Sequence, residues 1–370
     1  MKTRVAMQKK KLADVFLTLS VLYAVAAVLY GPRVLIMLVI AYLSAFLADK
    51  IFLLAFGLGK REKYDYSSYI TAMIITILLP AAAPYWIIPA GVFIALLLGK
   101  YCFGGAGINI FNPAAVGLGF LGLCWPDLVF RYTKPFERLP LRLNPETLTD
   151  VSFHNSLLHT LKNDGRPYVG YMEAILGNFA GPMGAGIMAV LVACGIFLIL
   201  RKTIPFEIPA AMFVTSSLFA LIVQRVNTGP LDSLVYETIA GVLVFGSIFI
   251  ATDPALIPVT NKGRVLFGLM LGFFAMLFRY YGKTEFGFVY AMLIVNALTG
   301  FCDDYADSLY KKIWKFIKTI VRITVKTLIW LGRHIKRLTL LTVKKISEKI
   351  NDIRKKDGDK SDGQTDQEEL

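Results

Sequence analysis

The chain has 370 residues, of which 56% are hydrophobic and 18% are charged, and its mean hydropathy is +0.58. Soluble domains contain about 45–50% apolar residues, so this composition excludes a soluble globular protein and indicates a membrane protein with room for roughly ten spans. The net charge of +14 comes largely from basic segments that flank and follow the apolar runs, so it does not indicate an acidic substrate.

Ten apolar runs follow one another along the chain, and each predicts a transmembrane helix. They cover residues 12–30, 34–57, 67–80, 84–100, 106–124, 182–200, 204–224, 234–251, 265–281 and 285–302. Basic residues test the count, because cytoplasmic segments carry the excess of Lys and Arg. Residues 1–11 and the segment after every second run are basic, which is consistent with ten crossings. The sequence therefore predicts a multi-pass protein of the cell membrane with both termini in the cytoplasm and an extracytoplasmic loop over 125–181.

The end of this loop is apolar again. The stretch "YMEAILGNFAGPMGAG", Tyr171 to Gly186, is too short to cross a membrane before Pro182, so it predicts a helix that lies at the interface or dips into the bilayer. Discontinuous segments with Gly and Pro are where transporters and ion-coupled membrane proteins place their sites. We therefore expect one functional region here.

The loop also contains "TDVSFHNSLLHTL", with two of the three histidines of the chain. His154 and His159 are five residues apart, which turns them away from each other on a helix, whereas metal-binding pairs favour a spacing of three or four. The four cysteines lie far apart and form no CxxC motif, unlike a zinc ribbon or a ferredoxin-type cluster. The pattern favours loop polarity or hydrogen bonding to an organic group over metal binding.

The composition changes after the last apolar run. Residues 311–356 contain 15 Lys or Arg against two acids, with apolar residues at helical spacing. We predict a basic amphipathic helix over 306–356 that lies on anionic lipid, with binding to a partner helix as a weaker alternative. No base-reading motif accompanies the charge, so nucleic acid is not an expected partner. The acidic end, 357–370, is predicted to be disordered.

Two polar constellations lie within or beside predicted spans, in "FGGAGINIFNPAAVG" and "FIATDPALIPVTNKGRVLFG". Their polar residues are Asn109, Asn112, Thr252, Asp253, Thr260 and Arg264. Amides and carboxylates in a membrane need partners, and Arg264 is an available partner for Asp253. Helix packing through small residues is the alternative for the first stretch. The predicted topology puts both constellations at the cytoplasmic half, so they are candidates to face one pocket.

Four stretches of the chain look like the motifs of a known family and occur in the same order as in that family. They are "GINIFNPAAVG", "LGNFAGPMG", "GSIFIATDP" followed by "TNKGRVLFG", and "YGKTEFGFVYAMLIVNAL". Over roughly residues 12–305 the chain resembles the RnfD/NqrB family, whose members belong to the Rnf electron-transport complex and to the sodium-translocating NADH:quinone reductase. The resemblance implies an all-α membrane domain of about ten spans in two related five-helix halves, like urea and ammonium channels. It also implies electron transfer in a complex that moves sodium ions or protons, with partner subunits that include one carrying FMN. Such a protein is expected to have no turnover alone.

In this family an extracytoplasmic Ser-Gly-Ala-Thr sequence carries FMN on its threonine through a phosphoester bond. The matching place here reads Ser-Phe-His-Asn, and Asn155 has no hydroxyl to esterify. Covalent FMN is therefore not expected, although Ser156 and Thr160 are nearby alcohols. The residues placed near a noncovalent flavin by this resemblance are Ser152, His154, Asn155 and Ser156.

The cytoplasmic constellations match the family motifs as they stand, and we expect them to hold a noncovalent flavin, FMN or riboflavin. A hydrocarbon core about 30 Å thick is too long for one efficient electron hop, so an electron-conducting subunit needs a carrier inside it. Two other functions remain open. One is a transporter or channel for a small polar solute or a flavin precursor, and the other is a scaffold subunit without a cofactor.

Overall fold

The computed structural model describes residues 2–57, 66–105, 107–137, 139–141, 151–225, 229–308, 310–312, 318 and 322. Across these residues the regular structure is helical, apart from an antiparallel bridge between Tyr132 and His154. Residues 1–307 form one compact unit, and residues 308–370 form a second. The predicted basic helix 306–356 lies almost wholly outside the described residues, and the predicted tail 357–370 lies wholly outside them.

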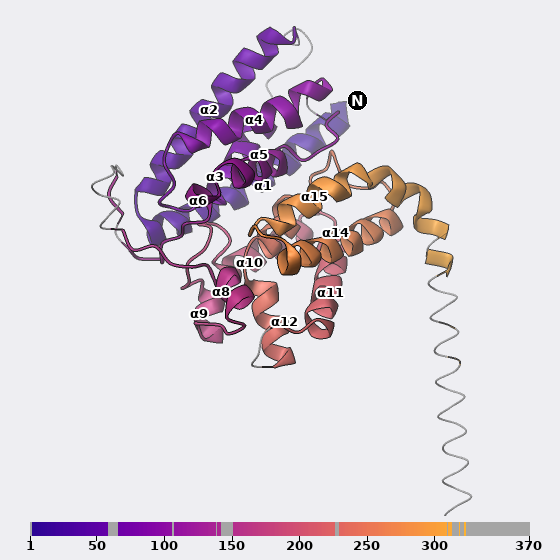
Figure 1. Ribbon diagram of the computed structural model, residues 1–370. Coiled ribbons are helices and arrows are strands. Elements are labelled where there is room, and N and C mark those ends of the chain that lie inside the picture. Colours follow the sequence, from indigo (N-terminus) through magenta and orange to yellow (C-terminus); the bar gives the residue numbers. More distant parts are fainter. Residues whose placement is uncertain are drawn as a thin grey trace, which may run out of the picture. The chain divides into compact units, whose positions relative to one another are not determined.

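The first unit contains two sets of long helices joined by a loop region (Figure 1). The first set consists of α1 (Lys2–Tyr30), α2 (Arg33–Ala55), α3 (Ser67–Ile77), α4 (Ile87–Gly99), the 3-10 turn η1 (Tyr101–Phe103) and α5 (Pro113–Cys124). The loop region contains α6 (Pro126–Val129), α8 (Leu157–Asn163) and α9 (Tyr171–Leu176). The second set consists of α10 (Met188–Leu200), α11 (Glu207–Ile222), α12 (Pro230–Ile239), α13 (Leu243–Phe249), α14 (Asn261–Tyr281) and α15 (Gly287–Ala297).

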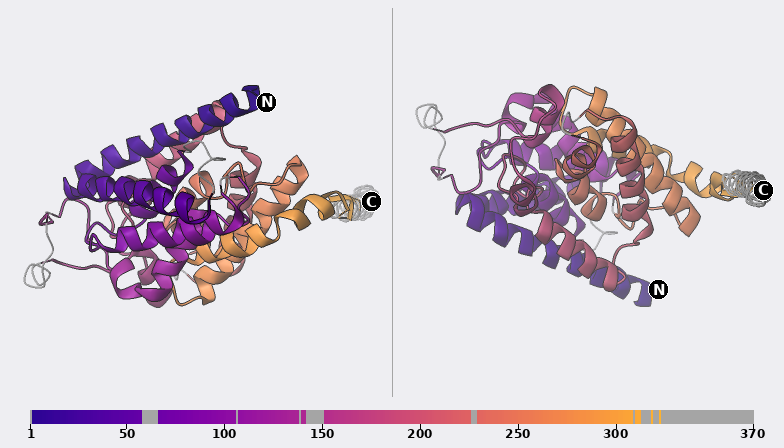
Figure 2. Two further views of the ribbon diagram at one scale, coloured as in Figure 1. Left: turned by 90° about the horizontal axis from the view of Figure 1, so that it is seen from above. Right: turned by 90° about the horizontal axis from the view of Figure 1, so that it is seen from below.

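The two sets repeat the same packing. In the first, α2 packs against α3 and α4, and α4 packs against α5. In the second, α11 packs against α12 and α14, and α14 packs against α15. Helices α1 and α10 open the two sets and contact each other, and Figure 2 shows α1 and α2 along one edge of the bundle. This repetition agrees with the predicted architecture of two related five-helix halves.

The chain is an all-α polytopic membrane protein. Among the described helices, Lys10–Tyr30, Arg33–Ala55 and Asn261–Tyr281 are long and apolar enough to cross a bilayer. The pair α12 and α13, bent by 60°, passes the same test as one interrupted span. The shorter apolar helices are Ser67–Ile77, Ile87–Phe103, Pro113–Cys124, Met188–Leu200, Glu207–Ile222 and Gly287–Ala297. Each predicted span overlaps at least one of these elements, and the number of crossings stays a prediction.

Several predicted spans are shorter as helices than their apolar runs. The run 106–124 becomes helical only at Pro113, because Asn112 caps the helix and the preceding residues are glycine-rich and irregular. The run 182–200 becomes helical only at Met188. The predicted helix over Tyr171 to Gly186 ends at Leu176, where Gly177 adopts a left-handed conformation with φ of +79°. Apolar composition overestimated the helices where glycine or proline interrupts them.

The irregular end of α3 is held by the segment that precedes α10. The Gly184 N–H donates to the Ile77 carbonyl over 2.8 Å, and the Met183 N–H donates to the Leu79 carbonyl over 3.4 Å. A Cβ atom at Gly184 would lie 2.6 Å from Ile77, so only glycine allows this close approach. These bonds satisfy backbone groups that the interrupted helix leaves unpaired, as a nonpolar environment requires.

A buried arginine also binds the segment that follows α3. The Arg33 side chain at the start of α2 donates to the carbonyls of Ala81 and Ala83, both over 2.7 Å, and to the carbonyl of Leu141 over 2.8 Å. Its guanidinium also lies 4.2 Å from the ring centre of Tyr85. One buried side chain therefore joins the start of α2, the segment after α3 and the loop region.

These contacts define two ends of the bundle. The loop end contains the α1–α2 turn, the loop region and the α14–α15 connection, because the Phe136 N–H donates to Leu29 O and the Ser156 hydroxyl donates to Glu285. The opposite end, which we call the tail end, contains the ends of α2 and α4 and the starts of α5 and α14.

Candidate functional site

The two polar constellations meet at the tail end. Asn112 Nδ2 donates to Asp253 Oδ2 over 3.2 Å and to the Ile250 carbonyl over 3.4 Å. Its Oδ1 accepts the Ala115 N–H over 3.1 Å, which caps α5. A single buried amide therefore starts α5 in the first half and holds the end of α13 in the second half.

The other predicted residues of this region have separate contacts. Thr252 is buried, and its hydroxyl donates to the Ile248 carbonyl. Thr260 caps α14 by accepting the Gly263 N–H over 3.0 Å. Arg264 donates to the carbonyls of Pro258 and Val259 and to the Asn261 side chain. Arg264 is thus engaged at the start of α14, whereas Asp253 accepts from Asn112 Nδ2 and from the Ala255 N–H.

Asp303 belongs to this region although the sequence did not single it out. It accepts the N–H groups of Val259 and Thr260 over 2.9 and 3.0 Å and the Thr260 hydroxyl over 2.8 Å. Burial raises the pKa of Asp303, but these hydrogen bonds and the nearby Arg264 charge outweigh burial and hold the pKa below its usual value. The available signal was an acid directly after the last apolar run.

The segment before α5 is the part of this region that is open to a bound flavin. Gly104 and Gly107 both have positive φ, and a Cβ atom at either would meet open space. Ile108 and Ile110 are exposed, and the half-buried Asn109 between them donates to the Phe111 carbonyl over 3.4 Å. Exposed apolar side chains beside an amide are groups that can contact the face and the polar edge of a planar ring.

At the loop end, the predicted residues do not converge on one point. Ser152 and Asn155 are exposed. His154 Nε2 lies 2.9 Å from Glu137 Oε1, whereas the His159 ring contacts Asn163 within α8. In the described part of the chain, no group of three His, Cys, Asp or Glu side chains is arranged to hold a metal ion.

Ser156 is the most deeply buried of the predicted loop residues. It is 4% exposed, and its hydroxyl donates to Glu285 Oε1 over 2.7 Å while accepting the His159 N–H over 3.0 Å. The nearby Thr160 hydroxyl is bonded to the Ser156 carbonyl. A buried hydroxyl with both functions occupied does not fit a phosphoester attachment site.

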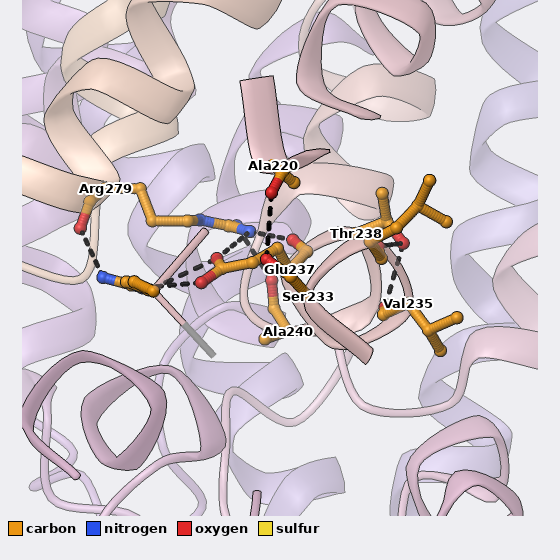
Figure 3. A network of polar contacts seen from close by, with 9 residues as sticks. Ala220, Ser233, Val235, Glu237, Thr238, Ala240 and Arg279 are labelled. Carbon is orange, nitrogen blue, oxygen red and sulfur yellow. Dashed lines mark hydrogen bonds and ion pairs between the residues drawn. The ribbon is translucent and has the colours of Figure 1, made fainter. Parts of the chain in front are cut away.

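A fully buried carboxylate lies between two arginines at the loop end (Figure 3). Arg225 Nε donates to Glu237 Oε1 over 2.6 Å, and its Nη2 donates to Oε2 over 3.2 Å. Arg279 Nη1 lies 3.7 Å from Glu237 Oε2, and its Nη2 donates to the Ala240 carbonyl over 2.8 Å. This cluster was missed, although charged residues inside predicted spans were a signal for it.

A second buried polar cluster lies at the tail end of the first half. Asp49 Oδ1 accepts the Ser68 hydroxyl over 2.7 Å and the Tyr101 hydroxyl over 2.6 Å. Lys100 Nζ donates to Ser68 over 2.8 Å and to Ser67 over 3.3 Å. The cluster joins the ends of α2 and α4 to the start of α3.

Comparison with known proteins gives consistent matches. A family model described as the NQR2, RnfD, RnfE family matches residues 3–310. The RnfD protein of the ion-translocating oxidoreductase complex of Haemophilus ducreyi is 30% identical, over 66% of this chain and 77% of the relative. Its counterpart from Haemophilus influenzae is 33% identical, over 65% and 76%. The counterpart from Mannheimia succiniciproducens is 31% identical, over 78% and 89%.

Proposed function

Because this chain belongs to the NQR2, RnfD, RnfE family, we propose that it is a membrane subunit of an ion-translocating electron-transport complex of the Rnf type. The family match across both halves of the membrane domain carries this proposal. The partners are then the other subunits of the complex, including one that carries FMN. The protein positions carriers and has no turnover alone.

We propose that the loop end faces the outside of the cell membrane and that both termini lie in the cytoplasm. Basic residues support this orientation, since Lys100 and Arg201 follow spans that end at the tail end. The basic segment 306–356 would then lie on the anionic cytoplasmic leaflet.

The tail end is the proposed site of a noncovalent flavin, FMN or riboflavin. The Asn112–Asp253 pair supplies a fixed polar edge, and the open segment around Asn109 supplies amide and apolar contacts. Thr252, Thr260 and Arg264 shape the adjoining backbone through the contacts described above. When bound, the flavin would accept and release electrons, while the chain would fix its position.

At the loop end, we propose that no FMN is attached covalently. Asn155 lacks the required hydroxyl, and the Ser156 hydroxyl is buried against Glu285. Ser152, His154 and Asn155 remain as polar contacts for a flavin that is held without a bond.

The test is to purify the full chain in mild detergent, record flavin absorbance, and then denature it in SDS. Flavin fluorescence only in the released fraction supports a noncovalent carrier. Fluorescence that stays with the protein band contradicts the absence of a covalent bond. Flavin in neither fraction contradicts the carrier and favours the transporter or the scaffold.

Two variants locate the flavin. Asn112→Ser keeps an oxygen that caps α5 but removes the amide donor to Asp253, so we expect less retained flavin. Asn163→Ala, at the loop end, is the matched control and should retain the same amount. Equal retention in both variants would contradict the tail-end site while leaving the family assignment intact.

A further inference from the structure

The loop region is fastened to the α14–α15 connection by a small set of polar contacts. Ser156 Oγ donates to Glu285 Oε1 over 2.7 Å, and Lys162 Nζ donates to the Gly282 carbonyl. Tyr132 lies beside them, held by its bridge to His154. We call Tyr132, Ser156, Lys162, Gly282 and Glu285 the loop latch.

The latch contains an unused hydrogen-bonding group. Tyr132 is fully buried, and its hydroxyl has no hydrogen-bond partner within the described residues. The Tyr132 hydroxyl is nevertheless close enough to Glu285 to lower the pKa of the carboxyl group, and Glu285 in turn raises the pKa of the phenol. A phenol oxygen that lacks a donor is available to a protonated carboxyl group.

The charges around Glu285 come from several elements. The cations Arg279 of α14 and Lys162 of α8 lower the pKa of Glu285, and Glu285 raises the pKa of the phenols Tyr132 and Tyr168 in the loop region. Arg279 is already bonded to Glu237 and to backbone carbonyls. Within the described residues, Glu285 forms no ion pair of its own, so burial of its charge is only partly compensated.

We propose that Glu285 is a proton-binding site, and that its bound proton fastens residues 151–163 to the α14–α15 connection. In the protonated form the carboxyl group has an O–H donor that the Tyr132 oxygen accepts, while its other oxygen keeps the Ser156 hydroxyl. Release of the proton to water leaves a carboxylate that favours solvent, so the latch opens more often.

The pH range over which Glu285 binds and releases its proton follows from the groups around it. Burial raises the pKa of Glu285 from 4.5 to about 7, against the opposing effects of the Ser156 and Tyr132 hydroxyls and the nearby cations. An open latch exposes the carboxyl group to water, where its pKa returns toward 4.5. Proton release therefore favours the open latch most strongly as the pH rises through neutrality.

The experiment is hydrogen exchange of the full chain in detergent at about pH 5.5 and about pH 8.5, corrected for the intrinsic exchange rate. Protection of peptides within 151–163 should fall about thirtyfold between these values, which is the effect of a pKa shift from 4.5 to about 7. In Glu285→Gln, protection should be high and equal at both values. Glu137→Gln, which changes a loop carboxylate paired with His154, should keep the fall.

Infrared spectroscopy detects the proton on Glu285 directly, whether or not the loop moves. Infrared difference spectra between the two pH values should show the carbonyl band of a protonated carboxylic acid that is absent from Glu285→Gln. A wild-type band that disappears as the pH rises, together with protection that does not change with pH, would overturn the latch but leave the proton site. A wild type without the band, or a Glu285→Gln variant that keeps the fall in protection, would overturn the whole proposal.

Discussion

Lys100 at the end of α4 and Arg279 near the end of α14 are corresponding buried cations of the two halves. Each is followed by a tyrosine, and the side chain of each reaches a short helix of its own half, α3 from Lys100 and α12 from Arg279. Lys100 lies at the tail end and Arg279 at the loop end. The repetition in helix packing is thus matched by a repetition in buried charge, at opposite ends of the bundle.

Removal of the Glu237 carboxylate should be among the most damaging single changes. Glu237→Ala leaves Arg225 and Arg279 buried without their counter-charge, which costs about 3–5 kcal/mol for pairs of this kind. Thermal unfolding in detergent would show a large fall in the midpoint. Glu207→Ala, which changes a half-buried acid at the start of α11, is the control and should shift the midpoint little. Equal midpoints for the two variants would contradict the role of the cluster.

The stability of the Asp49 cluster should depend on a hydrogen-bond acceptor in the side chain at position 49. Asp49→Ala leaves the buried hydroxyls of Ser68 and Tyr101 without their acceptor, which costs about 1–3 kcal/mol. Asp49→Asn keeps an acceptor oxygen, so its unfolding midpoint should lie between those of wild type and Asp49→Ala. If the asparagine variant is the less stable of the two, charge rather than acceptance controls this cluster.

Stability should depend on pH through Glu285. Its pKa is higher in the folded protein, about 7, than the ordinary 4.5, so the folded state binds more protons between these values. The stabilisation is therefore fully present below about pH 4.5 and is lost as the pH rises through about 7. We expect the unfolding midpoint of wild type to fall from pH 5 to pH 8 by more than that of Glu285→Gln. The same fall in both proteins would assign the pH dependence to other groups.

Gly184 should tolerate no side chain. In Gly184→Ala the new Cβ would lie 2.6 Å from Ile77, and overpacking of this kind costs about 1–3 kcal/mol. Gly170→Ala is the control, since a Cβ there meets nothing within 4 Å. The double variant Gly184→Ala, Ile77→Val should recover part of the loss, and strictly additive effects would show that Ile77 is not the obstacle.

Much of the architecture followed from apolar runs and alternating charge. The second helix matches its predicted limits closely, and the first ends at the predicted Tyr30 but begins at Lys2, ten residues before the predicted start. Neither run contains an interrupting proline or glycine. The break between α12 and α13 was not predicted, although Gly241 with φ of +74° lies at the break. A hydropathy pattern averages over such a residue and records one continuous run.

The candidate sites were predictable only in part. The meeting of Asn112 and Asp253 followed from topology, which placed both at one end of the membrane domain. The partners of Glu237 and Glu285 did not, because they lie 12 to 129 residues away along the chain and depend on the packing of separate helices. Sequence alone marks a buried charge as costly, but three-dimensional packing decides what compensates it.

The contacts of Arg33 also constrain how the protein is made. A ribosome delivers Ala81 and Ala83 long before Leu141, so the guanidinium gains its carbonyl partners in two stages as the chain enters the bilayer. Arg33 completes its hydrogen bonds only after the start of the loop region has been synthesised. The contacts of one side chain in the first half are therefore completed by a segment that lies beyond all five of its helices in the sequence.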